Sequence, residues 1–220
     1  MALKLAEVEP RDYTYVCTPT GDELPDVIDH WRNLEKILNS PIMMVSPGFT
    51  LKELCLHEKA LPNFRMRFCT KNLKIIPYQS WIMQRLPAVS FVGLRADEEG
   101  RAGVEWDAEL LLTTRYPLRE WGWGEEDVLE YLSQKGVTIP VRTDCARCYA
   151  QTLNEWYLLS VNHPKIYADA ISDEQRTGHT FRSPHRDTWP ADLASLKTAF
   201  KTRGIPPPRR RTGGCRICSL

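Results

Sequence analysis

Apolar and polar residues alternate along residues 1–140 in two different periods. Short runs rich in β-branched, aromatic and other apolar side chains predict buried strands at residues 13–17, 42–45, 89–94 and 109–114. Longer segments between them have apolar residues at helical spacing and predict helices at residues 2–8, 22–39, 51–56, 70–85 and 124–134. Because strands alternate with helices, we expect an α/β fold with a mostly parallel sheet flanked by helices.

The pattern changes after Pro140. We expect a helix over residues 145–161, an irregular polar segment over 163–189 and a final helix over 191–202. The chain is therefore predicted to have an α/β domain at residues 1–140. A C-terminal helical and irregular segment, which contains four of the seven cysteines, covers residues 141–220.

Two C-x-x-C pairs are the strongest chemical signal in the chain. Cys145 and Cys148 form the first pair, and Cys215 and Cys218 form the second. Two intervening residues let both sulfurs face one point, and two such pairs complete a four-thiolate site for zinc or an iron–sulfur cluster. The pairs are much farther apart than the roughly 15–20 residues of compact zinc motifs, so this site would tie distant segments together. Two disulfides, or four thiols packed as small apolar groups, are the alternatives.

Composition narrows the class of protein. The chain has 29 Lys and Arg against 28 Asp and Glu, a balance that does not favour a nucleic-acid or membrane surface. It contains no apolar run of about 18 residues, and acidic residues stand where a signal peptide would be apolar. We therefore expect a cytoplasmic protein without a membrane partner. In a reducing compartment, seven cysteines favour metal ligation with buried thiols over a disulfide framework.

Polar clusters follow the predicted strands. In a parallel sheet, ligands bind beyond the carboxyl ends of the strands, and basic side chains near a helix N-terminus suit phosphate or sulfate. The candidate residues are Thr20, Gly21, Asp22 and Glu23 after the first strand, Arg65, Arg67, Lys71 and Lys74 between, and Arg95, Asp97, Glu98 and Arg101 after the third. Each cluster also has a simpler interpretation as a turn, a helix start or a solvated face. We expect Asp97 and Glu98 to orient the two arginines through charge-assisted hydrogen bonds.

Four segments in order resemble the phosphoadenosine phosphosulfate reductase family, of the adenine nucleotide alpha hydrolase superfamily. They are YVCTPTGDELPDV, FCTKNLKIIPYQSWI, VGLRADEEGR and YPLREWGWGEEDVLEYLSQKGVTIP. These segments lie within residues 13–140, and the cysteine pairs extend the similarity toward the C-terminus. Each segment alone is a weak signal, whereas four in order together with the cysteines are specific.

The resemblance implies a Rossmann-like sheet with an adenosine nucleotide (ATP, APS or PAPS-like) over its C-terminal edge. By motif position, Gly21, Asp22 and Glu23 would border the nucleotide, and Asp97 and Glu98 would lie in the loop that completes its site. The basic residues that would face its anionic end are Lys71, Lys74, Arg95 and Arg101. Family members with a [4Fe–4S] cluster ligate it through similarly spaced cysteines, which implies this cluster at Cys145, Cys148, Cys215 and Cys218, with zinc as the alternative. The implied activity lies in sulfur metabolism or sulfur transfer.

The sequence departs from this family at two places. No glycine- and serine-rich S-G-G-x-D-S phosphate loop precedes Tyr13, so we expect a truncated product, a partner chain that supplies the loop, or a loss of phosphate binding. The family's cysteine-containing C-terminal tail is also missing after Cys218, so no catalytic residue is assigned. Cys69, among basic residues, is interpreted as structural or adjacent to the substrate.

The departures leave a second class of function open. The chain is either sulfonucleotide reductase-like or ATP-pyrophosphatase-like, or it is a non-catalytic metal-binding regulatory or interaction module. Such a module would work with a partner chain or, through Arg209, Arg210 and Arg211, with nucleic acid, which we do not favour. A stable domain with a structural zinc is a third interpretation. Homo-oligomerisation is also open.

Overall fold

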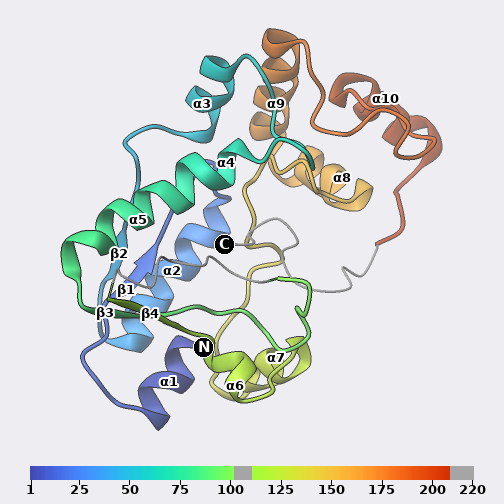
Figure 1. Ribbon diagram of the computed structural model, residues 1–220. Helices are drawn as coiled ribbons and strands as arrows, with labels where there is room; N and C mark the ends of the chain where they lie inside the picture. Colours follow the sequence, from blue (N-terminus) through green and yellow to red (C-terminus); the bar gives the residue numbers. More distant parts are fainter. Residues whose placement is uncertain (102–110, 209–220) are drawn as a thin grey trace.

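The computed structural model describes residues 1–101 and 111–208 (Figure 1). Its strands are β1 (Tyr15–Cys17), β2 (Ile42–Met44), β3 (Ala88–Phe91) and β4 (Leu112–Arg115). β1 pairs with β2 and β3 pairs with β4, both in parallel, so the described residues contain two separate two-stranded sheets. A mixed α/β fold with parallel pairing is confirmed, but the protein is mostly helical and each strand is shorter than predicted. The predicted fourth strand begins within residues 102–110, outside the described part.

Helices connect these strands largely as the apolar spacing predicts. They are α1 (Ala2–Val8), α2 (Pro25–Leu38), α3 (Leu51–Glu58), α6 (Pro117–Glu120) and α7 (Glu125–Gln134). α2 begins three residues later than predicted, because Pro25 occupies its first turn and Asp22 and Glu23 belong to the preceding loop. No helix in the described part of the chain is long and apolar enough to cross a membrane.

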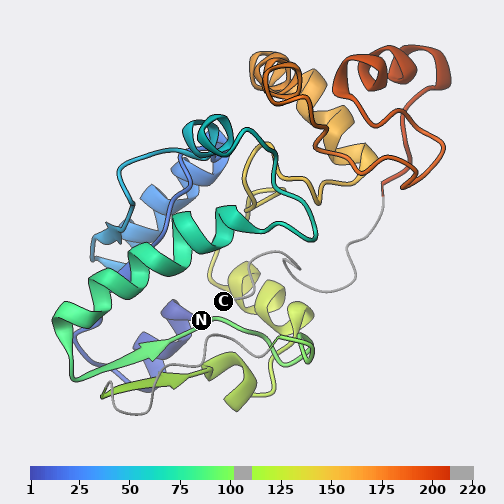
Figure 2. The ribbon, with the colours of Figure 1, turned by 45° about the horizontal axis from the view of Figure 1, so that its top comes forward.

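The predicted helix at residues 70–85 is a continuous run of four helical pieces. They are α4 (Phe68–Thr70), the π-helical turn η1 (Lys71–Ile75), α5 (Ile76–Ile82) and the 3₁₀ turn η2 (Met83–Arg85). Pro77 has no backbone N–H, and its ring would clash with the carbonyl four residues earlier in a regular helix. The wide π-helical turn ends at Ile75, two residues before the proline, and accommodates it. In Figure 2 this run lies beside the paired β3 and β4.

The C-terminal part is more helical than predicted. It contains α8 (Leu153–Asn162), α9 (Pro164–Thr177) and α10 (Leu193–Arg203). The predicted helix at 145–161 is wrong in its first half, because residues 145–152 form turns and Thr152 with Glu155 makes the capping box that starts α8. The predicted irregular segment at 163–189 is wrong where α9 lies. Most residues of α9 are polar, and only one narrow face of the helix, which includes Tyr167 and Ala170, is buried.

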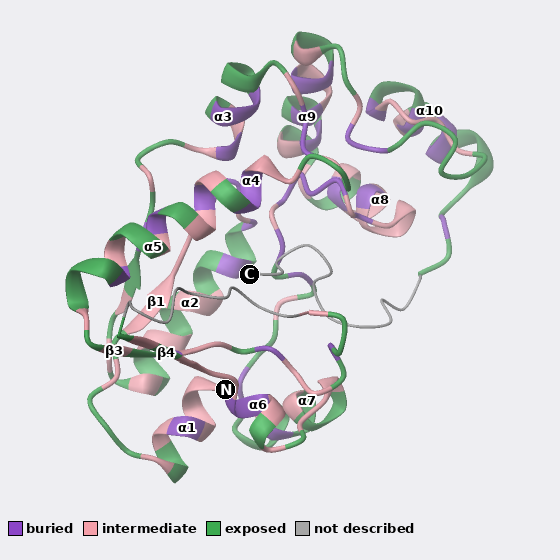
Figure 3. Ribbon diagram, viewed as in Figure 1, coloured by how far each residue is buried: buried purple, intermediate pink, exposed green. Residues whose placement is uncertain are grey.

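The main hydrophobic core lies among helices and not on the sheets. It joins Leu51 and Leu54 of α3 to Trp156 of α8, Tyr167 of α9 and Leu193 of α10. The rings of Trp156 and Tyr167 meet edge to face with centroids 6.2 Å apart. Figure 3 shows buried segments where α3, α8, α9 and α10 face one another. Residues on both sides of position 140 therefore share one core, which holds the cysteine loop against the loop after β1.

Glu174 of α9 is a buried carboxylate that organises this helical core. Its two oxygens accept backbone N–H bonds from Phe181 at 3.0 Å and Leu193 at 2.7 Å. Burial raises the pKa of Glu174 to about 7, while both backbone donors oppose this shift. Glu174 therefore connects α9 to the segment that follows it and to the start of α10.

We expect Glu174 to make the protein less stable as pH rises from about 4.5 to about 7. A pKa that is raised in the folded state means that the folded protein binds the proton more tightly than the unfolded chain. The resulting contribution to stability is complete below the ordinary pKa of 4.5 and is lost as pH approaches about 7. Urea unfolding of the native protein and Glu174→Gln across this window measures the effect. The difference in unfolding free energy between the two should shrink with rising pH, and a constant difference would contradict the assignment.

Candidate functional site

The loop after β1 is held by its own polar side chains. The Glu23 carboxylate accepts bonds from the Thr20 backbone N–H at 2.6 Å and from the Thr20 hydroxyl at 2.7 Å. Gly21 has φ of 71° and lies against Thr50, the residue that caps α3. Glu23 thus closes the turn, and Gly21 allows the loop to approach α3.

Gly21→Ala is expected to cost more stability than Gly48→Ala. Both glycines have positive φ, so alanine at either position pays about 1–2 kcal/mol for a left-handed conformation. A Cβ at Gly21 would also lie 2.6 Å from Thr50 Cγ2, whereas no atom lies within 4 Å of one at Gly48. Overpacking adds about 1–3 kcal/mol at Gly21. Urea unfolding measures both variants, and equal losses would show that the loop moves away from Thr50 without cost.

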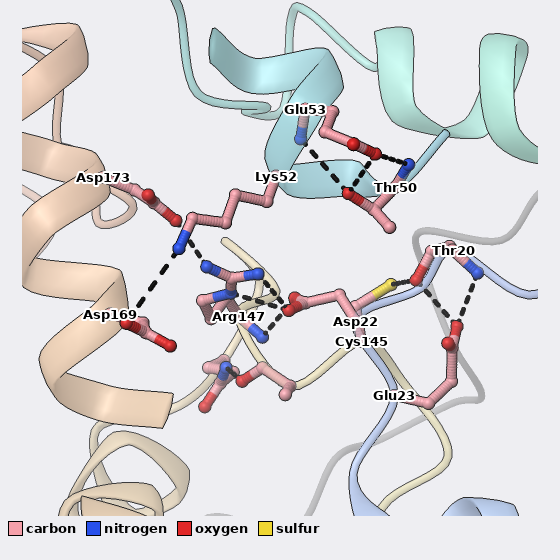
Figure 4. A network of polar contacts seen from close by, with 12 residues as sticks. Thr20, Asp22, Glu23, Thr50, Lys52, Glu53, Cys145, Arg147, Asp169 and Asp173 are labelled. Atoms are coloured by element: carbon pink, nitrogen blue, oxygen red, sulfur yellow. Dashed lines mark hydrogen bonds and ion pairs between the residues drawn. The ribbon is translucent and has the colours of Figure 1, made fainter. Parts of the chain in front are cut away.

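A buried ion-pair network joins this loop to the first cysteine pair (Figure 4). Arg147, inside the C-x-x-C sequence, donates to Asp22 through Nε at 2.6 Å and through its backbone N–H at 3.0 Å. Its guanidinium also donates to Asp173 of α9. All three residues are buried. Burial raises the pKa of Asp22 and of Asp173, and the guanidinium of Arg147 opposes the shift in each.

Cys145 and Cys148 lie at the end of this network. The Cys145 Sγ is 3.2 Å from the Thr20 hydroxyl oxygen, and an isolated backbone bridge pairs Cys145 with Glu23. Cys148 is buried, and its backbone N–H donates to the Cys145 carbonyl at 3.2 Å. The C-x-x-C pair therefore forms a tight turn packed directly against the loop after β1.

A small cavity brings a third cysteine to this pair. It has about 20 Å³ of free volume, room for about one water molecule. Its lining includes Cys69 of α4, Lys74 of η1, Thr20, Cys145 and Cys148. Cys69 was not among the predicted metal ligands. Its position in the FCTKNLK segment, one turn before Lys74, was the available signal.

The positive charge of Lys74 acts on two thiols of this region, those of Cys145 and Cys17. Burial raises the pKa of Cys145 well above its ordinary value, and the charge of Lys74 opposes that shift. Burial likewise raises the pKa of Cys17 to about 11, with a further increase from Glu23 and an opposing effect of Lys74. Lys74 lines the cavity with Thr20 and the cysteine pair, whereas Lys71 is exposed on the same helical run.

The residues described do not form a complete metal site by themselves. In residues 1–101 and 111–208, no group of three or more His, Cys, Asp or Glu side chains is arranged to hold a metal ion. Cys215 and Cys218, with Arg209, Arg210 and Arg211, lie outside the described residues. The described chain therefore contributes one thiol pair, with Cys69 on the same cavity.

The cluster after β3 is a separate group of charges. Arg95 pairs with Asp97 at 2.8 Å, and Arg101 pairs with Glu98 at 2.5 Å. Asp97 also accepts the backbone N–H of Glu125 at 3.0 Å, where α7 begins. The expectation that the two acids orient the two arginines is confirmed. The hydrogen bond from Glu125 links this cluster to the start of α7.

Comparison of the sequence with protein-family models and with curated proteins gives no match.

Proposed function

We propose that this chain is a phosphoadenosine phosphosulfate reductase-like protein that binds an adenosine nucleotide and a thiolate-ligated [4Fe–4S] cluster. The proposed sheet is Rossmann-like, and the activity lies in sulfur metabolism or sulfur transfer. Cys145 and Cys148 would ligate the cluster together with Cys215 and Cys218. When bound, the cluster would supply electrostatic and redox chemistry beside the nucleotide. Zinc at the same thiols is the alternative metal.

The observation that carries this proposal is the cavity shared by cysteines and a lysine. Cys69 and Lys74 line it together with the Cys145–Cys148 pair, which lies more than 70 residues farther along the chain. The Cys145–Cys148 pair is the kind of thiol pair that ligates a soft metal, and a lysine beside it offsets the negative charge of thiolates and of a sulfate or phosphate. The loops that resemble the family's nucleotide-binding segments follow β1 and β3, where parallel strands offer ligand sites.

Metal analysis tests the proposed centre. We expect anaerobically purified protein to be brown, to absorb near 400 nm and to contain about four irons. Cys145→Ser and Cys148→Ser should each abolish the absorbance and the bound iron. Cys69→Ser should reduce both if its thiol, on the same cavity, supports the centre. A colourless protein with about one zinc per chain would contradict the cluster and identify the metal as structural zinc.

Cys55→Ala is the matched control. Cys55 is also a buried cysteine, but it belongs to α3 and does not line the cavity. Burial raises the pKa of its thiol to about 12. This variant should keep its metal, and its stability should fall only as expected for the loss of a small buried side chain. Loss of metal from the Cys55 variant to the same extent would indicate unfolding and would remove the argument for the cysteine pair.

A non-catalytic binding module is the second candidate, and one observation favours it. Asp22, Arg95, Asp97, Glu98 and Arg101 all form internal ion pairs that a nucleotide would have to share or replace. Titration calorimetry with ATP and with adenylyl sulfate distinguishes the two functions. Binding that weakens in Lys74→Ala supports the nucleotide site. Absence of heat at millimolar nucleotide in protein that contains its metal supports the module.

A further inference from the structure

A large cavity separates the two small sheets. It has about 780 Å³ of free volume. Residues 13–18, which contain β1, line one side, and residues 87–93, which contain β3, line another. The rings of Tyr13 and Phe91 meet at a centroid distance of 5.6 Å and join the two walls. The cavity thus follows one strand of each sheet over its full length.

The unpaired edges of both sheets face this cavity. β1 pairs only with β2 among the described residues, and β3 only with β4. Ile42 is the only β2 residue in the lining, and β4 contributes no lining residue. The cavity therefore lies on the side of β1 and β3 opposite their partners. Backbone N–H and C=O groups on these edges need hydrogen-bond partners, and a two-stranded sheet is marginally stable by itself.

The rest of the lining is apolar and aromatic. Outside the strands it includes Trp31 of α2 with Tyr78, Trp81 and Ile82 of α5. Three charged residues, Arg11, Asp12 and Arg85, are also present. The interior therefore offers backbone hydrogen bonds at two edges and apolar surface elsewhere, as the interior position of a parallel sheet does.

We propose that this cavity receives an apolar β-strand from a partner polypeptide, which pairs with β1 on one side and β3 on the other. The two sheets then become one five-stranded sheet. A strand of about five residues, at about 3.3 Å per residue and 4.8 Å from its neighbours in a layer about 10 Å thick, occupies roughly 800 Å³. The cavity has room for it. A small planar ligand fills volume, but it leaves most backbone groups on both edges unpaired.

A strand fused to this chain tests the proposal. Strand addition depends mainly on backbone hydrogen bonds, so a designed sequence is a valid probe, and fusion gives it a millimolar effective concentration. Met1 lines the cavity, so the extension Thr-Val-Ile-Val-Ile-Val-Thr with a Gly-Ser linker is placed before it. The control extension Thr-Pro-Ile-Pro-Ile-Pro-Thr has the same length, but its prolines cannot donate backbone hydrogen bonds.

Hydrogen exchange of the complete chain reports the result. We expect the strand extension to slow amide exchange at least tenfold in both β1 and β3, and to raise the urea midpoint, while the proline extension changes neither. Protection of neither strand, of one strand alone, or equal protection by both extensions would overturn the proposal. Equal protection of both strands in the unextended protein by millimolar ATP would identify a ligand cavity instead. These outcomes are independent of the metal content that tests the proposed function.

Discussion

Arg147→Ala is expected to lower the free energy of unfolding by about 3–5 kcal/mol, because it leaves buried carboxylates without their cation. Arg147 donates to Asp22 and Asp173, and each of the three side chains is less than one-tenth exposed. Urea unfolding at pH 7 measures the loss.

The control is an arginine of similar geometry at the surface. Arg32 pairs with Asp29 at 2.9 Å within α2, and both side chains are exposed. Arg32→Ala should therefore change stability by only about 0.2–1 kcal/mol. Arg147→Lys keeps the charge, but a single ammonium group cannot bind Asp22 and Asp173 as the guanidinium does. Its loss of unfolding free energy should therefore lie between those of Arg147→Ala and Arg32→Ala. A cost for Arg147→Ala as small as that for Arg32→Ala would mean that water already reaches Asp22 and Asp173.

The Arg147 network also bears on function. The family resemblance assigns Asp22 to the border of a nucleotide, yet in the structure Asp22 holds the C-x-x-C loop through both carboxylate oxygens. This contact positions Cys145 beside Thr20. If Arg147→Ala folds at low temperature, it should lose the proposed metal as Cys145→Ser does, because the thiol pair loses its anchor. Nucleotide affinity then separates a positioning role of Asp22 from direct contact.

Trp156→Ala is expected to destabilise the protein by about 3–5 kcal/mol, since it opens a large cavity in the helical core. Trp156 has no exposed surface and packs against Tyr167 and Phe181 with ring centroids 6.2 and 5.7 Å away. The truncation removes contacts of α8 with α9 at once. Thermal and urea unfolding followed by circular dichroism measure the change.

Trp156→Phe distinguishes the contribution of apolar packing from that of the indole N–H. The Trp156 Nε1 is buried and lacks a hydrogen-bond partner among the described residues. Phenylalanine keeps most of the apolar contact and removes this unpaired donor, whose burial costs about 1–3 kcal/mol. We therefore expect Trp156→Phe to cost much less than Trp156→Ala. Similar losses in the two variants would show that the indole nitrogen has a partner in solution.

The local pattern of apolar and polar residues was sufficient to predict most helices and strands of the first 140 residues. Helix α1 lies at the predicted residues, and β1, β2 and β3 fall inside or within one residue of the predicted strands. These elements have strong local signals, because side-chain periodicity decides which face is buried before any long-range contact forms. The pairing of Arg95 with Asp97 and of Arg101 with Glu98 was also predictable, since the partners are two or three residues apart.

The C-terminal part shows where local pattern was insufficient. Helix α9 looks polar in sequence because its buried face is narrow and includes Asp173 and Glu174, whose partners come from elsewhere in the chain. For the same reason, the sequence did not show that Arg147 is buried between Asp22 and Asp173. Burial of a charge depends on partners far away in sequence, and periodicity contains no information about them.

By itself, the sequence determined the type and order of most elements in the first 140 residues, the parallel α/β character and the two cysteine pairs as candidate ligands, because each depends on residues close together in the chain. Only the tertiary structure decided that Cys69 and Lys74 share a cavity with Cys145 and Cys148, that Asp22 is bound to Arg147, and that the sheet is divided in two around a cavity. Each of these features joins residues that are distant in sequence, and such contacts form only when the helices and loops pack together.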